Sequence, residues 1–224
     1  MAFTVHAVMP GVWHIVDCMG VCMTLLEGEN AAMLVDTGYG IEDVADFMRH
    51  MTDLPLTVFL THNHHDHAMG ARCFPETYML EADMADWRMF TNDEMRRRVL
   101  TQAIGKNLPV DEKTFLAGEI PLPKVMKPGV IDLGGLTAEI IEAPGHTPGS
   151  AVVYVPERKL LLSGDDWNPC TWLFFPQALG LREYRSNMRG IQQLPFEKVL
   201  CPHREALYDR WMFDDFFNAL TDGN

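Results

Sequence analysis

Long hydrophobic runs are missing from this 224-residue sequence, which nowhere reaches the roughly 18 consecutive apolar residues of a membrane-spanning helix. Its first residues, "MAFTVHAVMPGVW", have neither the basic segment nor the continuous apolar segment of a secretory signal. Internal repeats, low-complexity segments and linkers are absent as well. We therefore expect no membrane partner and no array of repeated units.

Positively charged residues are scarce, with 18 Lys and Arg against 31 Asp and Glu, which gives a formal net charge of −13. Such a chain repels the phosphate backbone of DNA or RNA unless its few cations cluster. The run "RRR" at 96–98 falls within a predicted helix and forms a single patch. We therefore expect no nucleic-acid partner.

Cysteines are few and irregularly placed, at Cys18, Cys22, Cys73, Cys170 and Cys201. Their number is odd, and the spacing of the first two is not the C-x-x-C of a redox or zinc pair. These features favour reduced thiols over disulfides, and hence a cytoplasmic protein.

Apolar residues are plentiful enough for a core: 47% of the chain is hydrophobic and 22% is charged, which is ordinary for a globular protein. At about 150 residues per domain, this length suits one large domain or a domain with a small insertion. The composition indicates neither disorder nor a fibrous protein.

Short β-rich runs and amphipathic helices alternate in two halves of the chain. Strands are predicted at 3–8, 11–17, 21–29, 31–38, 55–62, 136–144 and 197–202, with a hairpin at 150–165. Helices are predicted at 41–51, 81–104, 181–194 and 205–220. This order predicts one α/β domain over residues 1–224, with a helical insertion at about 81–130.

Four of the nine histidines lie in "HNHHDH", residues 62–67, directly after the apolar run "PLTVFL". His62 and His64 are two residues apart, so at a strand end they project to the same side and can hold one cation. Asp66 and His67 follow where the chain must turn, and they can bind a cation at a second position. A solvated polar loop is the alternative, but imidazole and carboxylate at this spacing favour a site for Zn²⁺, Fe or Mn.

Three further polar residues follow predicted hydrophobic strands. His146 lies in the Gly/Pro-framed turn "APGHTPGS", Asp165 follows "LLLSG", and His203 follows "KVLCP". Each alone is most simply an ordinary turn or strand-end residue. Together they occupy the positions where open α/β sheets present their chemistry.

These motifs, in this order, resemble those of the metallo-β-lactamase superfamily: "HNHHDH" matches its HxHxDH signature, and "AAMLVDTG", "PGHTPGS" and "LLSGD" match its other motifs. The resemblance spans roughly residues 12–203. It implies a four-layer αβ/βα sandwich, with two sheets face to face, helices outside and the site at one edge.

The resemblance also implies two divalent metal ions, with zinc as the first expectation and Fe or Mn as alternatives. The first ion would be held by His62, His64 and His146, the second by Asp66, His67 and His203, with Asp165 bridging both. Asp66 would also orient the nucleophile and transfer a proton. Asp36 of "VDTG" would lie behind the site and orient a metal ligand. The alternative is that Asp36 only caps its turn. His65 and Asp166 are expected not to bind metal.

Such a site implies hydrolysis by a metal-activated water, and no G-x-S-x-G nucleophile motif is present. Among small hydrolases of the superfamily, the chain resembles glyoxalase II-type thioesterases most. We expect it to be without their C-terminal glutathione-binding region, and no Lys or Arg occurs between Lys159 and Arg182. We therefore expect a small-molecule thioester as substrate, with an acyl-homoserine lactone-type lactone as the alternative. A mononuclear iron persulfide dioxygenase is the alternative from another class.

Aromatic residues gather after Asp165, and they are predicted either to line an apolar substrate pocket or to pack their loop onto the core. These residues are Trp167, Trp172, Phe174, Phe175 and Tyr184. Tyr184 and Tyr208 are the candidates for a tyrosine that polarises the substrate carbonyl. The oligomeric state does not follow from the sequence.

Overall fold

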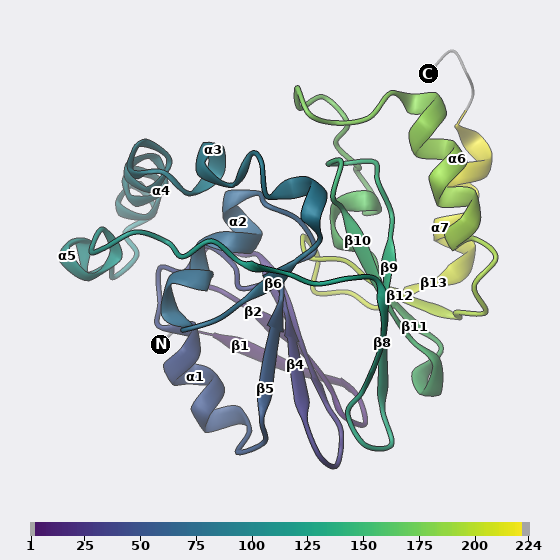
Figure 1. The fold of residues 1–224 in the computed structure, drawn as a ribbon, viewed down its shortest axis with the longest axis horizontal. Coiled ribbons are helices and arrows are strands. Elements are labelled where there is room, and N and C mark those ends of the chain that lie inside the picture. The colour runs from purple at the N-terminus through teal and green to yellow at the C-terminus, as the bar shows by residue number, and fades with distance from the viewer. Residues whose placement is uncertain (1–2, 221–224) are drawn as a thin grey trace.

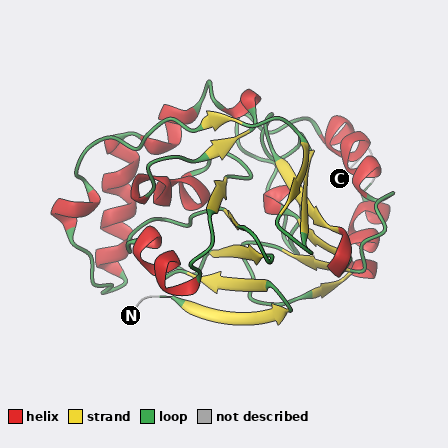
Figure 2. Cartoon of the chain, turned by 60° about the horizontal axis from the view of Figure 1, so that its bottom comes forward, coloured by secondary structure: helices red, strands yellow, loops and turns green. Residues whose placement is uncertain are grey.

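The computed structural model describes residues 3–220. Two β-sheets pack face to face, and helices cover the outer faces (Figure 1). Strands β1 to β7 form the first sheet in chain order, and the second sheet has the order β13-β12-β11-β10-β9-β8. The strands lie between two sets of helices (Figure 2), which is the predicted four-layer sandwich.

The first sheet begins as an antiparallel meander and continues with parallel strands. Its strands are β1 Thr4–Met9, β2 Val12–Val16, β3 Cys22–Glu27, β4 Ala32–Val35, β5 Leu56–Phe59, β6 Tyr78–Met79 and β7 Lys124–Val125. The crossover from β4 to β5 contains helix α1, Val44–Met51, where a helix was predicted from residue 41. It begins later because the Asp43 side chain accepts the backbone N–H of Asp46 and caps the helix there.

The helical segment predicted at 81–104 is found, but it is divided. The structure has a 3-10 turn η2 at Glu81–Asp83, a short helix α3 at Trp87–Thr91 and a longer helix α4 at Asp93–Gly105. Asn92 breaks the run because its backbone is extended and its side chain caps α4 at the Met95 N–H. A further short helix, α5 Glu112–Phe115, precedes β7.

The second sheet contains β8 Gly129–Asp132, β9 Thr137–Glu142, β10 Ala151–Val155, β11 Leu160–Leu162, β12 Lys198–Leu200 and β13 Tyr208–Asp209. Helices α6, Leu181–Ile191, and α7, Arg210–Ala219, pack on its outer face (Figure 1). The helix predicted from residue 205 begins only at 210, because Tyr208 and Asp209 pair with β12 instead.

Side chains of β10 show how the layers are built. Ala151, Val153 and Val155 face the first sheet, in a buried cluster that also contains Met33 and Phe59. Val152 and Tyr154 point the other way and pack against α6 and α7, for example on Met188 and Phe213. This alternation follows from the two-residue period of a strand that is buried on both faces. Within residues 3–220, no helix has the length and apolar character needed to cross a membrane.

Candidate metal centre

The seven predicted ligand residues meet at one edge of the sandwich, although they come from both halves of the chain. His62 and His64 follow β5, and the short helix α2, His65–Ala68, carries Asp66 and His67. His146 lies in the turn between β9 and β10, Asp165 in the 3-10 turn after β11, and His203 after β12. Every one of them follows a strand, as predicted from the sequence.

These side chains form two groups whose nitrogen and oxygen atoms lie within 4.8 Å of one another in each group. The first group is His62, His64, His146 and Asp165, and all four are buried. The second group is Asp66, His67 and His203, of which only His67 is fully buried. His65 belongs to neither group and is partly exposed at the surface of α2.

Asp165 lies between the two groups. One of its oxygens is 3.4 Å from His146 Nε2 in the first group. The other is 3.0 Å from His203 Nε2 and 3.5 Å from His67 Nε2 in the second. One buried carboxylate therefore faces imidazoles of both groups, which is the arrangement a bridging ligand requires.

The residues fit a metal because buried ring nitrogens are left without partners. The Nε2 atoms of His62 and His67 have no hydrogen-bond partner within the described part of the chain, although both rings are fully buried. Their other ring nitrogens are occupied, since His62 Nδ1 lies 3.0 Å from Thr61 Oγ1 and His67 Nδ1 lies 2.9 Å from Asp36 Oδ2. An unpartnered buried nitrogen is costly, and a cation between these groups would satisfy both.

Asp36 is placed to orient His67. It is buried, has a left-handed backbone with φ 65°, and accepts hydrogen bonds from Thr61 N (2.7 Å) and Thr61 Oγ1 (3.0 Å). Its second oxygen holds His67 Nδ1, which directs Nε2 toward Asp165. Carboxylate–histidine pairs of this kind fix the tautomer and orientation of metal ligands.

The electrostatics of the two groups differ. Burial lowers the pKa of His64 to about 3 and lowers the pKa values of His62 and His146 as well, so these imidazoles are neutral at pH 7. Burial alone would also lower the pKa of His67, but Asp165, Asp66 and Asp36 raise it well above the ordinary value.

The aromatic residues predicted at the mouth of the site divide into two sets. Trp172 and Phe175 lie at the site, since the Trp172 ring is 5.3 Å from the His203 ring and the Phe175 ring is 4.7 Å from the His64 ring. Phe174 packs beside them with its ring tilted and is 73% exposed. Trp172 also accepts a hydrogen bond from His146 Nδ1 at its carbonyl oxygen (2.7 Å).

Trp167 and Tyr184 are in the second set. Both are fully buried in the core between the second sheet and helices α6 and α7. The Tyr184 hydroxyl donates to the carbonyl oxygen of Asp166, and the Asp166 carboxylate accepts the His146 N–H at 2.9 Å. Tyr208 packs edge-on against Trp167, 5.4 Å between ring centroids. The structure therefore does not bring Trp167, Tyr184 or Tyr208 to the metal groups.

Several residues at the site carry no signal in the sequence. Phe90 of α3 packs on His64, with 4.4 Å between ring centroids. Gln177 Nε2 lies 3.3 Å from His64 Nε2. Tyr39 and Arg204 line a cavity of about 260 Å³ beside Asp66, His203 and Trp172.

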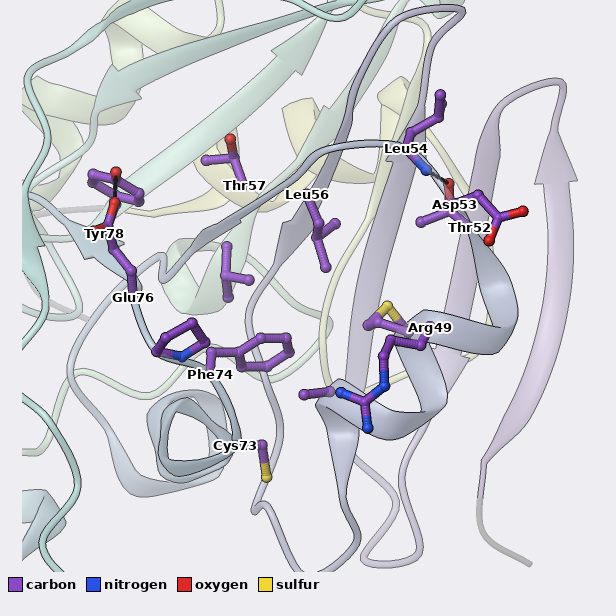
Figure 3. Close-up of a pocket in the computed structure, with 14 residues that line it drawn as sticks. Arg49, Thr52, Asp53, Leu54, Leu56, Thr57, Cys73, Phe74, Glu76 and Tyr78 are labelled. Atoms are coloured by element: carbon purple, nitrogen blue, oxygen red, sulfur yellow. Dashed lines mark hydrogen bonds between the residues drawn. The ribbon is translucent and has the colours of Figure 1, made fainter.

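A larger cavity of about 640 Å³ lies elsewhere, between α1, β5 and residues 73–78 (Figure 3). Its wall includes Arg49, Leu56 and Phe74, and none of its lining residues belongs to either His/Asp group. Chemistry is therefore expected at the smaller cavity, where the titratable side chains converge.

Comparisons with known proteins identify the family of the chain. Residues 16–203 match the family described as the Metallo-beta-lactamase superfamily. The chain belongs to this superfamily. Acyl-coenzyme A thioesterase MBLAC2 from Gallus gallus is 26% identical over 200 residues, which are 80% of this chain and 70% of that protein.

Solved structures of the metallo-β-lactamase fold superpose over most of the chain. FIM-1 from Pseudomonas aeruginosa, in a mono-zinc form, gives a TM-score of 0.68 at 16% identity and covers 96% of this chain and 92% of its own. TTHA1623, in a di-iron-bound form, gives a TM-score of 0.59 at 22% identity. The match covers 87% of this chain and 92% of TTHA1623. At these identities the likeness shows the fold, and it confirms the predicted sandwich. The two His/Asp groups are of the kind typical of dinuclear sites in the superfamily.

Proposed function

We propose that this metallo-β-lactamase superfamily protein is a metal-dependent hydrolase of a small acyl thioester. The observation that carries the proposal is Asp165, a buried carboxylate that faces imidazoles of both His/Asp groups. The similarity to an acyl-coenzyme A thioesterase supports a thioester substrate. A coenzyme A thioester is accordingly the first substrate to test, ahead of a glutathione thioester.

Two divalent ions, zinc first, would be held by the residues of the two groups. When bound, such ions supply Lewis acidity and lower the pKa of a water molecule toward neutrality. Asp66 is 13% exposed at its side chain and lies at the cavity, so it can hold the water in place and accept a proton from it. Burial alone would raise the pKa values of Asp66 and Asp165, but the neighbouring imidazoles, His67 first, lower both of them.

The surroundings of the site favour an apolar acyl portion. Trp172 and Phe174 are 37% and 73% exposed beside the site, which is a large apolar surface for side chains in this position. Arg204 contributes a positive charge to the same cavity and can meet an anionic part of the substrate. A small molecule that combines an apolar acyl chain with a negatively charged carrier fits both features.

The experiment is a turnover panel on protein that has been stripped with a chelator and reloaded with Zn²⁺ or Mn²⁺. The panel contains coenzyme A and glutathione thioesters, lactones, β-lactams and phosphodiesters, and a His146→Ala variant serves as the inactive control. Thioester hydrolysis that disappears on chelation and returns with metal is expected. Cleavage of lactones alone would overturn the thioester assignment, and oxygen consumption with a persulfide by iron-loaded protein would overturn the hydrolase assignment.

The remaining features belong to the same proposal. All five cysteines are free, which supports a reducing compartment and hence the cytoplasm. The partner we propose is the small-molecule substrate alone, since the charge of −13 disfavours a nucleic acid.

A further inference from the structure

A buried carboxylate outside both metal groups joins the two chain segments that carry the histidines of the first group. Asp83 lies in η2, between β6 and α3, and is 1% exposed. One of its oxygens accepts hydrogen bonds from Asn63 N (3.2 Å) and Thr147 Oγ1 (2.7 Å), and the other accepts from Gly149 N (2.6 Å). Asn63 lies between His62 and His64, and Thr147 directly follows His146.

Close packing around this carboxylate makes the connection rigid. The Asn63 side chain donates a further hydrogen bond to the Asp83 carbonyl oxygen (3.0 Å), so Asn63 is held at both its backbone and its side chain. A Cβ on Gly149 would lie 2.6 Å from Asp83 N and 2.7 Å from its carboxylate. Only glycine permits this approach, which brings the turn after His146 directly against Asp83.

The connection brings two imidazoles of the first group within reach of one shared cation. His64 Nδ1 and His146 Nε2 are 2.9 Å apart, although the two residues are 82 positions apart in the chain and belong to different halves of the sandwich. Ligands at this separation keep their geometry only if their supporting loops cannot move independently. Asp83 bonds to both loops at once.

We propose that Asp83 is a positioning residue, which fixes the distance between the His62–His64 loop and the His146 turn and so sets the affinity of the first metal group. This inference rests on the proposed function in one respect, that the His/Asp groups hold metal. It adds a role for Asp83, which belongs to neither group but holds the ligand loops of the two halves of the sandwich together.

The test is metal binding by Asp83→Asn. The amide has nearly the same shape, but its NH₂ group cannot accept from a backbone N–H or from the Thr147 hydroxyl, so at least one connection is lost. Metal-free protein is titrated with Co²⁺ and followed by visible absorption. Wild type is expected to saturate with two equivalents, whereas in the variant one of the two dissociation constants rises about 10- to 100-fold.

Asp17→Asn is the matched control. Asp17 is an equally buried aspartate that accepts backbone N–H groups, those of Met19, Gly20, Val21 and Tyr39. It bonds to neither loop of the first group, so its variant should lose thermal stability but keep the wild-type Co²⁺ affinities. Equal weakening of Co²⁺ binding in both variants would show a general effect of destabilisation and overturn the inference.

Two further results keep the inference falsifiable. If Asp83→Asn does not fold, Thr147→Val removes one donor to the same carboxylate, and a 3- to 10-fold weaker Co²⁺ affinity is expected; an unchanged affinity overturns the inference. If wild type binds two Co²⁺ ions and Asp83→Asn binds them with unchanged affinities, this inference is overturned and the proposed function is not. Wild type that binds no metal overturns the proposed function and this inference with it.

Discussion

At the scale of single residues, Asp165 distinguishes a paired metal site from two separate ones. Because its two oxygens face His146 and His203, Asp165→Asn should lower the occupancy of both ions while the fold remains intact. Metal content by mass spectrometry and circular dichroism of the same sample measure the two effects. A variant that kept two ions and full turnover would show that Asp165 does not bridge.

His65 and His64 provide a comparison of neighbours. His65 packs edge-on against Tyr39, 5.5 Å between ring centroids, and lies outside both groups, whereas His64 is a buried member of the first. His65→Ala should therefore retain metal and most activity, and His64→Ala should lose both. Metal analysis of the two variants side by side checks this. Equal losses would mean that the register of the loop has been assigned incorrectly.

The pKa differences between the groups predict an order of metal release on acidification. The pKa values of His62 and His64 are lowered, so protons compete with metal in the first group only at acid pH. The pKa values of His67 and His203 are raised, so protons compete already near neutrality. Dialysis between pH 8 and pH 4 should remove one ion before the other. Simultaneous release of both would contradict the assignment.

The ligand types and spacings could be recognised in the sequence because each follows a hydrophobic strand. Phe90, Gln177 and Asp83 could not, since their roles depend on contacts with residues far away in the chain. Tyr184, in contrast, was a candidate site residue that the structure does not bring to the metal groups. Its position after the aromatic loop suggested a substrate contact, but helix α6 turns the ring into the core.

At the scale of elements, hydrophobic periodicity located the strands and most helices but missed breaks that depend on single caps. The apolar pattern continues through Asn92, although the helix restarts there. The sequence pattern at Tyr208 and Asp209 predicts a helix, but these residues pair with the edge of β12 and form β13. In both places a tertiary or capping hydrogen bond overrides a continuous pattern.

Arg96 of α4 fixes the segment that follows this helix. Its side chain is 1% exposed, and its guanidinium donates to the carbonyl oxygens of Phe115, Ala117 (3.2 Å) and Gly118 (2.7 Å). Arg96→Leu leaves three carbonyls without this donor and should lower the free energy of unfolding by about 3 kcal/mol. Urea unfolding measures the loss, and hydrogen exchange should locate it at residues 111–118.

Arg97→Leu is the control for this change, because Arg97 is the exposed neighbour on the same helix. It should leave stability and exchange unchanged, and neither variant should alter the metal content. A similar loss in both variants would assign the effect to helix propensity or net charge rather than to the three carbonyls.

At the scale of the whole molecule, the candidate metal centre is shared between the two halves. Residues 62–67 supply four of the seven ligands beside the first sheet, and His146, Asp165 and His203 supply three beside the second. Family motifs could predict this division and the layers. They could not predict the short strands β6 and β7, whose two-residue pairings depend on where the intervening helices lie.

Metal removal should therefore destabilise the whole chain and not only the site. An ion present at 1,000 times its dissociation constant stabilises the native state by about 4 kcal/mol. In a chain of this length each kcal/mol shifts the unfolding midpoint by about 2–4 °C. Chelation should thus lower the midpoint by on the order of 10 °C, and Zn²⁺ should restore it.

In His146→Ala, which lacks one ligand joining the halves, the chelator should cause at most half of this shift. Equal midpoints with and without chelator in the wild type would mean that the sheets are held by their apolar interface alone.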